Sequence, residues 1–80
     1  MPRPLKVLVL SDALEPTSLT TDVRPWLRSP DWRAQANVLA ALARLGHTAE
    51  CLAIFDDLHL LRQKLDGFQP DLIFNLADQF

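Results

Sequence analysis

Three short apolar runs, separated by two segments with helical spacing, constrain the fold of this chain more than any other feature. The runs cover residues 5–10, 48–55 and 71–76. The segments between them, residues 29–46 and 56–67, repeat apolar side chains every three to four positions. Strands that alternate with helices pair in parallel through right-handed crossovers. The sequence therefore predicts an α/β fold with a three-stranded parallel sheet in the order 2-1-3, half of a Rossmann-like doubly wound domain.

The two predicted helices begin and end at residues that favour helix termini. Ser29 is expected to accept a backbone hydrogen bond as the N-cap of the first helix, and Asp56 or Asp57 is expected to cap the second. Glycine tolerates the left-handed backbone conformation that often follows the last helical turn. Gly46 and Gly67 are therefore expected to end the first and the second helix.

Apolar side chains at helical spacing define the faces that the helices turn toward the sheet. The predicted stripes contain Trp32, Ala36, Leu39, Leu42 or Ala43, and Leu45 in the first helix, and Leu58, Leu61 and Leu65 in the second. Trp32, together with Trp26 from the preceding loop, is expected to anchor this packing rather than to stack on bases.

Residues 11–30 are the longest stretch without a predicted regular element. They contain three prolines and several Ser, Thr and Asp residues, which argue against a helix or a strand. A loop of this length in so small a chain is usually functional or mobile.

Size and composition narrow the possible classes of protein. A chain of 80 residues is expected to form one domain, residues 1–80. A net charge of −2 gives no electrostatic footprint for nucleic acid, and the first apolar run is too short for a signal peptide or a membrane span. Cys51 is the only cysteine, so no internal disulfide forms, and it is interpreted as a small buried hydrophobic residue. We therefore expect a cytoplasmic protein that binds neither nucleic acid nor membrane.

Polar residues follow the first and third predicted strands, where open α/β sheets bind ligands near the point at which strand order reverses. Ser11 and Asp12 either turn the chain or contact a ligand. Asparagine is depleted in strands and costly to bury without hydrogen bonds. Asn75 is therefore expected to hold a substrate or neighbouring loop, or only to bond the loop after the first strand. Asp78 and Gln79 complete the polar rim.

Several familiar sites are not predicted. The adjacent Asp56 and Asp57 are interpreted as helix caps rather than metal ligands. His47 is expected to contact the carbonyls that end the first helix, and with His59 and one cysteine it forms no zinc pattern. The chain has only two glycines, so it contains no glycine-rich phosphate loop.

Two known families share this outline in part. The third strand of phosphoacceptor receiver domains is similar to PDLIF, but Leu76 stands where the phosphorylated aspartate would be. Leucine cannot accept a phosphoryl group, so that family is excluded. The N-terminal half of nucleotide-sugar glycosyltransferases resembles the segments VLVLSD and ALARLGHTAECLA, and a fragment of such an enzyme is an alternative.

The resemblance covers more of the chain in the D-alanine–D-alanine ligase-like branch of the ATP-grasp superfamily. NVLAALARLGHTAECLAIFDDLHLLRQKL resembles the first helix, second strand and second helix of the domain that precedes the ATP-grasp fold. PDLIFNLADQF resembles the next strand of that domain and the acidic loop after it. The resemblance implies the N-terminal, pre-ATP-grasp domain of an ATP-dependent carboxylate–amine ligase.

The same resemblance implies which domain of such a ligase binds which reactant. These enzymes use ATP and magnesium to convert a carboxylate to an acyl phosphate, which an amine then attacks. The N-terminal domain lines the acid-substrate side, whereas nucleotide and metal ligands belong to downstream ATP-grasp domains absent from this chain. The isolated chain is thus expected to bind no cofactor and to be inactive. The residues expected to contact the substrate or those domains are Ser11, Asp12, Asn75, Asp78 and Gln79.

A different class of function is a non-catalytic interaction module. The third predicted strand has an open edge and no following helix to cover one of its faces. Edges of that kind pair readily with another chain. The alternative is therefore an α/β module that self-associates, with a second copy of the chain as its partner.

Overall fold

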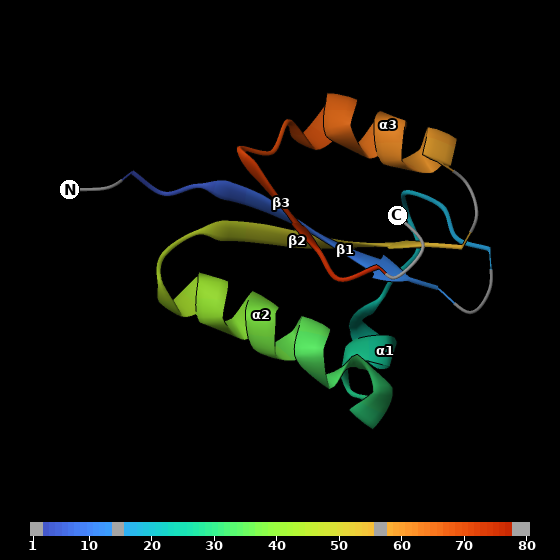
Figure 1. Cartoon of the computed structure of the whole chain (residues 1–80), viewed down its shortest axis with the longest axis horizontal. Helices are drawn as coiled ribbons and strands as arrows, with labels where there is room; N and C mark the ends of the chain where they lie inside the picture. Colours follow the sequence, from blue (N-terminus) through green and yellow to red (C-terminus); the bar gives the residue numbers. More distant parts are fainter. Residues whose placement is uncertain (1–2, 14–15, 56–57, 78–80) are drawn as a thin grey trace.

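The computed structural model of this chain describes residues 3–13, 16–55 and 58–77. Its elements in chain order are β1 (Lys6–Asp12), α1 (Arg24–Leu27), the 3-10 turn η1 (Pro30–Trp32), α2 (Arg33–Arg44), β2 (Thr48–Ile54), α3 (Leu58–Phe68) and β3 (Leu72–Asn75) (Figure 1).

The three strands form one parallel sheet with β1 at its centre, in the order β2-β1-β3. Leu10 of β1 pairs with Leu52 on one side and with Asn75 on the other, so the carboxyl ends of the strands meet at one edge. Helix α2 lies on one side of the sheet and α3 on the opposite side (Figure 1). The predicted α/β fold and its strand order are confirmed.

The side chains of β1 alternate between two apolar layers, because successive residues of a strand point to opposite faces. On the α3 side, Leu8 and Leu10 pack in a cluster that includes Ile54 and Phe68. On the α2 side, Trp32 forms a second cluster with Ala13, which directly follows β1, and Ala53 of β2. β1 is covered on both faces, which explains its almost continuous apolar sequence.

The first predicted helix begins at its expected cap, but its first residues form a 3-10 turn rather than an α-helix. Ser29 Oγ accepts a hydrogen bond from the Asp31 N–H at 3.3 Å, which confirms Ser29 as an N-cap. The chain then makes the 3-10 turn η1 before α2 starts at Arg33. Gly46 takes a left-handed conformation after α2, with φ of 86°, as predicted.

The end of α3 differs from the prediction. Gly67 lies inside the helix, which continues to Phe68, and Gln69 takes the left-handed conformation with φ of 52°. Phe68 is buried in the cluster on the α3 side. The additional helical residues therefore bring an aromatic ring into the core, and this burial outweighs the preference of glycine for the helix end.

Two members of the predicted helical stripes are exposed. Leu45 follows α2 as its C-cap and is 72% exposed, and Leu58 begins α3 and is 58% exposed. Within α3, the buried positions are Leu60 and Phe68. The spacing predicted amphipathic helices, but the expectation that Leu45 and Leu58 face the sheet was wrong.

The stretch between β1 and α2 is more ordered than its sequence indicates. Residues 24–27 form the short helix α1, and Trp26 within it packs against Trp32 with ring centroids 5.4 Å apart. Trp32 is 8% exposed and joins the α2-side cluster. Both tryptophans are thus packing anchors, as predicted.

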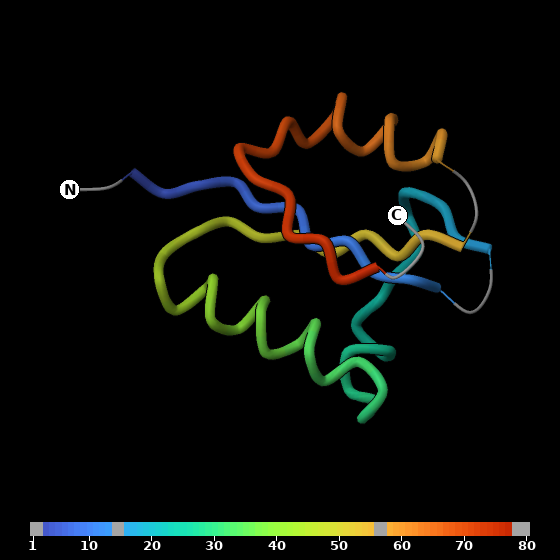
Figure 2. The backbone as a smooth tube through the Cα atoms, viewed as in Figure 1, coloured from blue at the N-terminus to red at the C-terminus, as the bar shows by residue number. Residues whose placement is uncertain are grey.

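The segment 16–23 passes around the outer edge of β2 (Figure 2). Thr17 Oγ1 donates a hydrogen bond to the Ala53 carbonyl of β2 at 2.5 Å. Leu19 then lies beside α3, on one side of the sheet, whereas Val23 packs against the cluster on the other side. The irregular stretch therefore covers the carboxyl end of the β2 edge.

β3 is exposed, although it lies in an apolar run, residues 71–76, of the kind typical of covered strands. The strand spans Leu72–Asn75, and all four of its residues are exposed. Neither buried cluster contains a residue of β3. The apolar sequence of this strand identified it as β structure but did not reveal its place at the outside of the sheet.

None of the helices in the described part of the chain is long and apolar enough to cross a lipid bilayer.

Candidate functional site

The carboxyl end of β1 carries a buried side-chain hydrogen bond. Gln35 Nε2, from the first turn of α2, donates to Ser11 Oγ at 2.7 Å, and Ser11 Oγ donates to the Asp12 carbonyl at 3.3 Å. Ser11 is 1% exposed and pairs with Ala53 in the sheet. The serine is therefore part of β1 and joins it to α2, so of its two predicted roles the turn is excluded.

Asp12 also belongs to β1, as its last residue, and pairs with Ile54. It is half-buried. Because strand residues alternate between faces, its side chain is directed to the α3 side, whereas that of Ser11 is directed to α2. Asn75 pairs with Leu10, which also faces α3. The sheet thus brings Asp12 and Asn75 to one face and Ser11 to the other.

Asn75 is exposed, which corrects the expectation of a costly buried amide. Its Oδ1 accepts a hydrogen bond from the Ala77 N–H at 2.9 Å, a local turn that asparagine commonly makes. The Leu76 N–H donates to the Leu10 carbonyl at 2.9 Å, which keeps the chain beside β1 as it leaves the strand. Asp78 and Gln79, like Asp56 and Asp57, lie outside the described residues.

Gln35 is the residue whose role at this site was not predicted. It lies on α2 three residues after Trp32 and four before Leu39, so it occupies the apolar stripe of the helix. An amide at such a position must find a hydrogen-bond partner when it approaches the core. That interruption of the stripe was the signal that could have identified the contact with Ser11.

At the opposite end of the sheet, two side chains accept hydrogen bonds from the main chain at the start of β1. His47 Nδ1 accepts a hydrogen bond from the Leu5 N–H at 3.0 Å, so the imidazole does not cap α2 as predicted. Asp71 accepts from the Lys6 N–H at 2.9 Å and from Arg3 at 3.3 Å. These hydrogen bonds, chiefly the one from Lys6, hold the pKa of the Asp71 carboxyl below its usual value. Both contacts hold the start of β1 in place, far along the strands from Ser11.

Cys51 is a half-buried residue of β2 that packs against the α2-side cluster. Burial raises the pKa of its thiol to about 11. The thiol is therefore protonated near neutral pH, which makes it a poor nucleophile and metal ligand. This agrees with its interpretation as a small hydrophobic residue.

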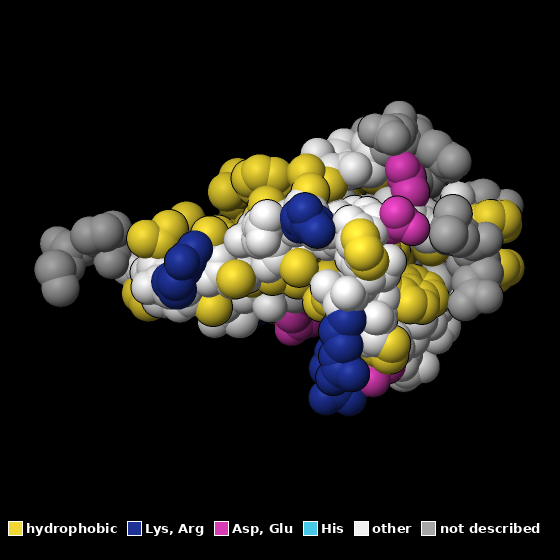
Figure 3. Space-filling model, turned by 90° about the horizontal axis from the view of Figure 1, so that it is seen from below, with side chains coloured by type: hydrophobic (Ala, Val, Ile, Leu, Met, Phe, Trp, Pro, Cys, Tyr) yellow, Lys and Arg dark blue, Asp and Glu magenta, His cyan; other side chains and the backbone are white. Residues whose placement is uncertain are grey.

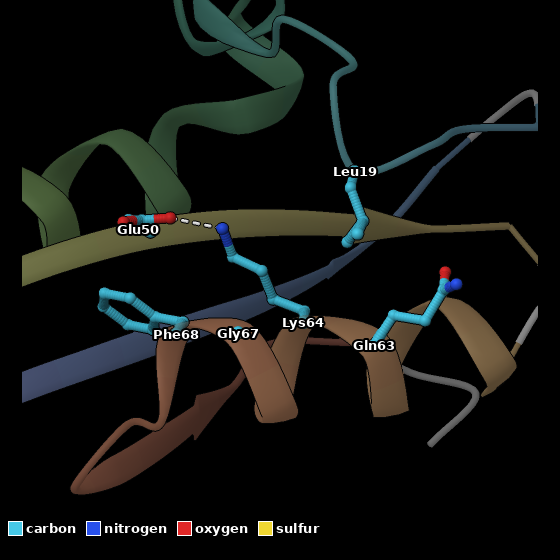
Figure 4. A pocket seen from close by; sticks show the side chains of 6 residues that line it. All are labelled: Leu19, Glu50, Gln63, Lys64, Gly67 and Phe68. Carbon is cyan, nitrogen blue, oxygen red and sulfur yellow. Dashed lines mark hydrogen bonds and ion pairs between the residues drawn. The ribbon is translucent and has the colours of Figure 1, made fainter.

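A shallow hollow between segment 16–23 and α3 is separate from the carboxyl ends of the strands (Figure 4). Lys64 points across it to Glu50, with which it forms an ion pair, and Leu19 reaches down from the loop (Figure 4). The Lys64 ammonium also lies 5.4 Å from the centre of the Phe68 ring. Since the lysine charge is matched by Glu50, the hollow offers little attraction to a charged ligand.

The described residues contain no group of three or more His, Cys, Asp or Glu side chains that could hold a metal ion. The described residues of the carboxyl edge can bind and orient a ligand through hydrogen bonds with a carboxylate, an amide and main-chain groups. Ser11 Oγ bonds the Gln35 amide and the Asp12 carbonyl, neither of which is a general base.

No protein-family model, no curated protein and no solved structure matches this chain.

Proposed function

We propose that this chain is the substrate-side α/β domain of an ATP-dependent carboxylate–amine ligase of the D-alanine–D-alanine ligase-like ATP-grasp family. The proposal rests on the sequence resemblance described above. The two resembling segments, residues 37–65 and 70–80, include most of α2 together with β2, α3 and β3. Resemblance and secondary structure therefore agree over that part of the chain.

The observation that supports a substrate-side role is the hydrogen bond between Gln35 and Ser11. It ties the first turn of α2 to the carboxyl end of the central strand, next to the point where strand order reverses. Ligands of open α/β sheets bind at that point. Ser11 is too deeply buried to touch a ligand, so Ser11 and Gln35 are positioning residues. Asp12 and Asn75, at the same edge, are the side chains that would face the acid substrate.

The proposal places the ATP and magnesium sites outside this chain. The described part has no cluster of metal-ligating side chains, and the sequence has no glycine-rich turn after β1. The proposal therefore assigns to this chain only the binding and orientation of the substrate. In such a ligase, bound MgATP supplies the phosphoryl group that activates the carboxylate. We also place the protein in the cytoplasm, where its single cysteine stays reduced.

The proposal is tested with the protein expressed from the whole reading frame that encodes this chain. Phosphate release from MgATP is measured with D-alanine and with a panel of other amino acids and dipeptides. We expect release that requires both a carboxylate substrate and an amine. Phosphate release that is independent of every such substrate, or clear calorimetric binding of MgATP by residues 1–80 alone, would overturn the proposal.

Substitution of Gln35 tests the positioning role. Gln35→Leu removes the donor to Ser11 and is expected to raise KM for the acid substrate at least tenfold. Gln35→Glu can still accept a hydrogen bond from the serine hydroxyl and is expected to restore most of the affinity. Gln63→Leu, an exposed glutamine on α3, is the matched control and should leave KM unchanged.

A further inference from the structure

The outer edge of β3 is the part of the described surface that is least protected against pairing with another strand. Leu72, Ile73 and Phe74 are 50%, 42% and 41% exposed. Residues 72–77 carry no charge and no proline. Natural edge strands are usually protected by charged side chains, proline, bulges or a covering segment. No described segment covers β3 on its outer side.

The main chain of β3 is oriented for pairing. The Leu76 N–H donates to the Leu10 carbonyl of β1 at 2.9 Å, in step with the pairing of Leu10 and Asn75. Alternate residues of a parallel strand direct their main-chain groups to the same neighbour. The N–H and C=O groups of Leu72 and Phe74 are therefore directed to β1, and those of Ile73 are directed away from β1, toward the open edge.

The side chains of β3 extend both faces of the sheet. Leu72 and Phe74 pair with Val7 and Val9, so they lie on the α2 side, whereas Ile73 pairs with Leu8 and lies on the α3 side. The space-filling view of the α2 side shows hydrophobic side chains gathered at the surface (Figure 3). A strand added at this edge would cover apolar surface on both faces.

We propose that two copies of this chain pair through β3 in an antiparallel, two-fold symmetric arrangement centred on Ile73. In this register the two Ile73 residues exchange main-chain hydrogen bonds and form a hydrogen-bonded pair. Leu72 of each copy lies opposite Phe74 of the second copy as a non-hydrogen-bonded pair. This pairing satisfies the outward main-chain groups and places apolar side chains opposite one another on both faces.

The charges around β3 are compatible with this register. The Asp71 carboxylate of each copy is matched by its own Arg3 and lies opposite the neutral Asn75 of the second copy. The two carboxylates are at opposite ends of the paired strands, so like charges do not meet.

The pairing is weak and ends at two copies. Four residues from each strand bury much less than the roughly 1,200 Å² of a stable interface, so we expect a dissociation constant on the order of 1 mM. At the other sheet edge, segment 16–23 contacts the carboxyl end of β2, and Glu50 places a charged side chain on the remainder of the strand. Charged side chains and covering segments protect an edge against pairing, so we expect no growth into a filament. This inference does not depend on the proposed ligase function.

Disulfide trapping tests the register directly. In a Cys51→Ala background, Ile73→Cys is oxidised at about 0.5 mM chain and the rate of dimer formation is followed by non-reducing electrophoresis. Opposed residues of an antiparallel pair have Cβ atoms about 4.5–5.5 Å apart, close to disulfide geometry. We expect Ile73→Cys to cross-link at least tenfold faster than Leu45→Cys, a control at a more exposed position. Equal rates would overturn the proposal.

Sedimentation equilibrium tests the association without any cross-link. The mass-average of the unmodified chain is expected to rise from one toward two chain masses between about 0.05 and 2 mM. Ile73→Lys, checked for folding by circular dichroism, should stay monomeric, and Leu45→Lys should behave like the unmodified chain. A monomer throughout, or assemblies larger than a dimer, would contradict the closed β3 pairing.

Discussion

β2 and β3 are the two outer strands of one sheet, and they solve the problem of an exposed edge differently. β2 carries Glu50, accepts a hydrogen bond from Thr17 at Ala53 and has segment 16–23 running around it. β3 is short, uncharged and apolar, and every residue of it is exposed. A stretch that its sequence marks as irregular thus protects one edge, whereas a stretch that its sequence marks as a core strand is left open.

The comparison also explains where stability resides. Leu52, Ala53 and Ile54 of β2 are buried, and both clusters draw on this strand. β3 contributes to neither cluster. The described core is therefore centred on β1 and β2, and β3 is attached mainly by its ladder to β1 and by Asp71.

The largest difference between the two edges is expected from one pair of matched substitutions on the α3 side. Ile54→Ala empties a site that is fully buried, and we expect it to lower the free energy of unfolding by about 4 kcal/mol. Ile73→Ala, at a position that is 42% exposed, should cost about 1 kcal/mol. Urea unfolding at low chain concentration measures both values. Similar losses would show that β3 is part of the core.

The covering of β2 is expected to have a smaller effect. Thr17→Val keeps the shape of the side chain but removes the hydrogen bond to the Ala53 carbonyl, which should cost about 1 kcal/mol. Amide exchange of residues 16–23 should become faster if this bond holds the segment in place. Thr48→Val, at an exposed residue of β2, serves as the control. No change in exchange would mean that the segment does not depend on Thr17.

The attachment of β3 to β1 is expected to depend on pH. The Lys6 N–H, with Arg3, lowers the pKa of the Asp71 carboxyl from 3.8, so the ionised form stabilises the fold. This contribution is present above pH 4 and is lost as the pH falls through the lowered pKa. Asp71→Asn should therefore be less stable than the unmodified chain at pH 7, and the two should converge as the pH falls through the lowered pKa. Urea midpoints across this range test the prediction, with Asp66→Asn as a control that should show no such convergence.

The smallest effect is expected at the ion pair beside the β2 edge. Lys64→Gln removes the partner of Glu50 and should lower stability by about 0.5 kcal/mol, because such pairs near the surface are screened by solvent. The loss should decrease further in 1 M salt. A loss above 2 kcal/mol would indicate that the lysine matters through its packing on Phe68 rather than through charge.

The fold was largely predictable, because each local signal agreed with the others. The apolar run at residues 5–10, the cap at Ser29 and the left-handed Gly46 all lie where the pattern indicates them. The end of α3 was not predictable from Gly67, because the burial of Phe68 decides it. Local propensity therefore gave way where a large side chain could reach the core.

The candidate site was predictable only in its location. Ser11, Asp12 and Asn75 do lie toward the carboxyl ends of their strands, as the alternation of strands and helices requires. Their roles differ from the prediction, since Ser11 bonds Gln35 within the structure and Asn75 turns the chain at Ala77. Which of two neighbouring residues faces α2 and which faces α3 depends on the register of the sheet.

By itself, the sequence determined the elements, their parallel pairing and the edge at which polar residues gather, because hydrophobic spacing and chain connectivity leave few alternatives. Only the tertiary structure decided which outer strand is covered. Segment 16–23 covers the carboxyl end of the β2 edge through contacts made far apart along the chain, such as that between Thr17 and Ala53. Burial depends on what the rest of the chain places over a strand, and β3 has the composition of a buried strand without a described element to bury it.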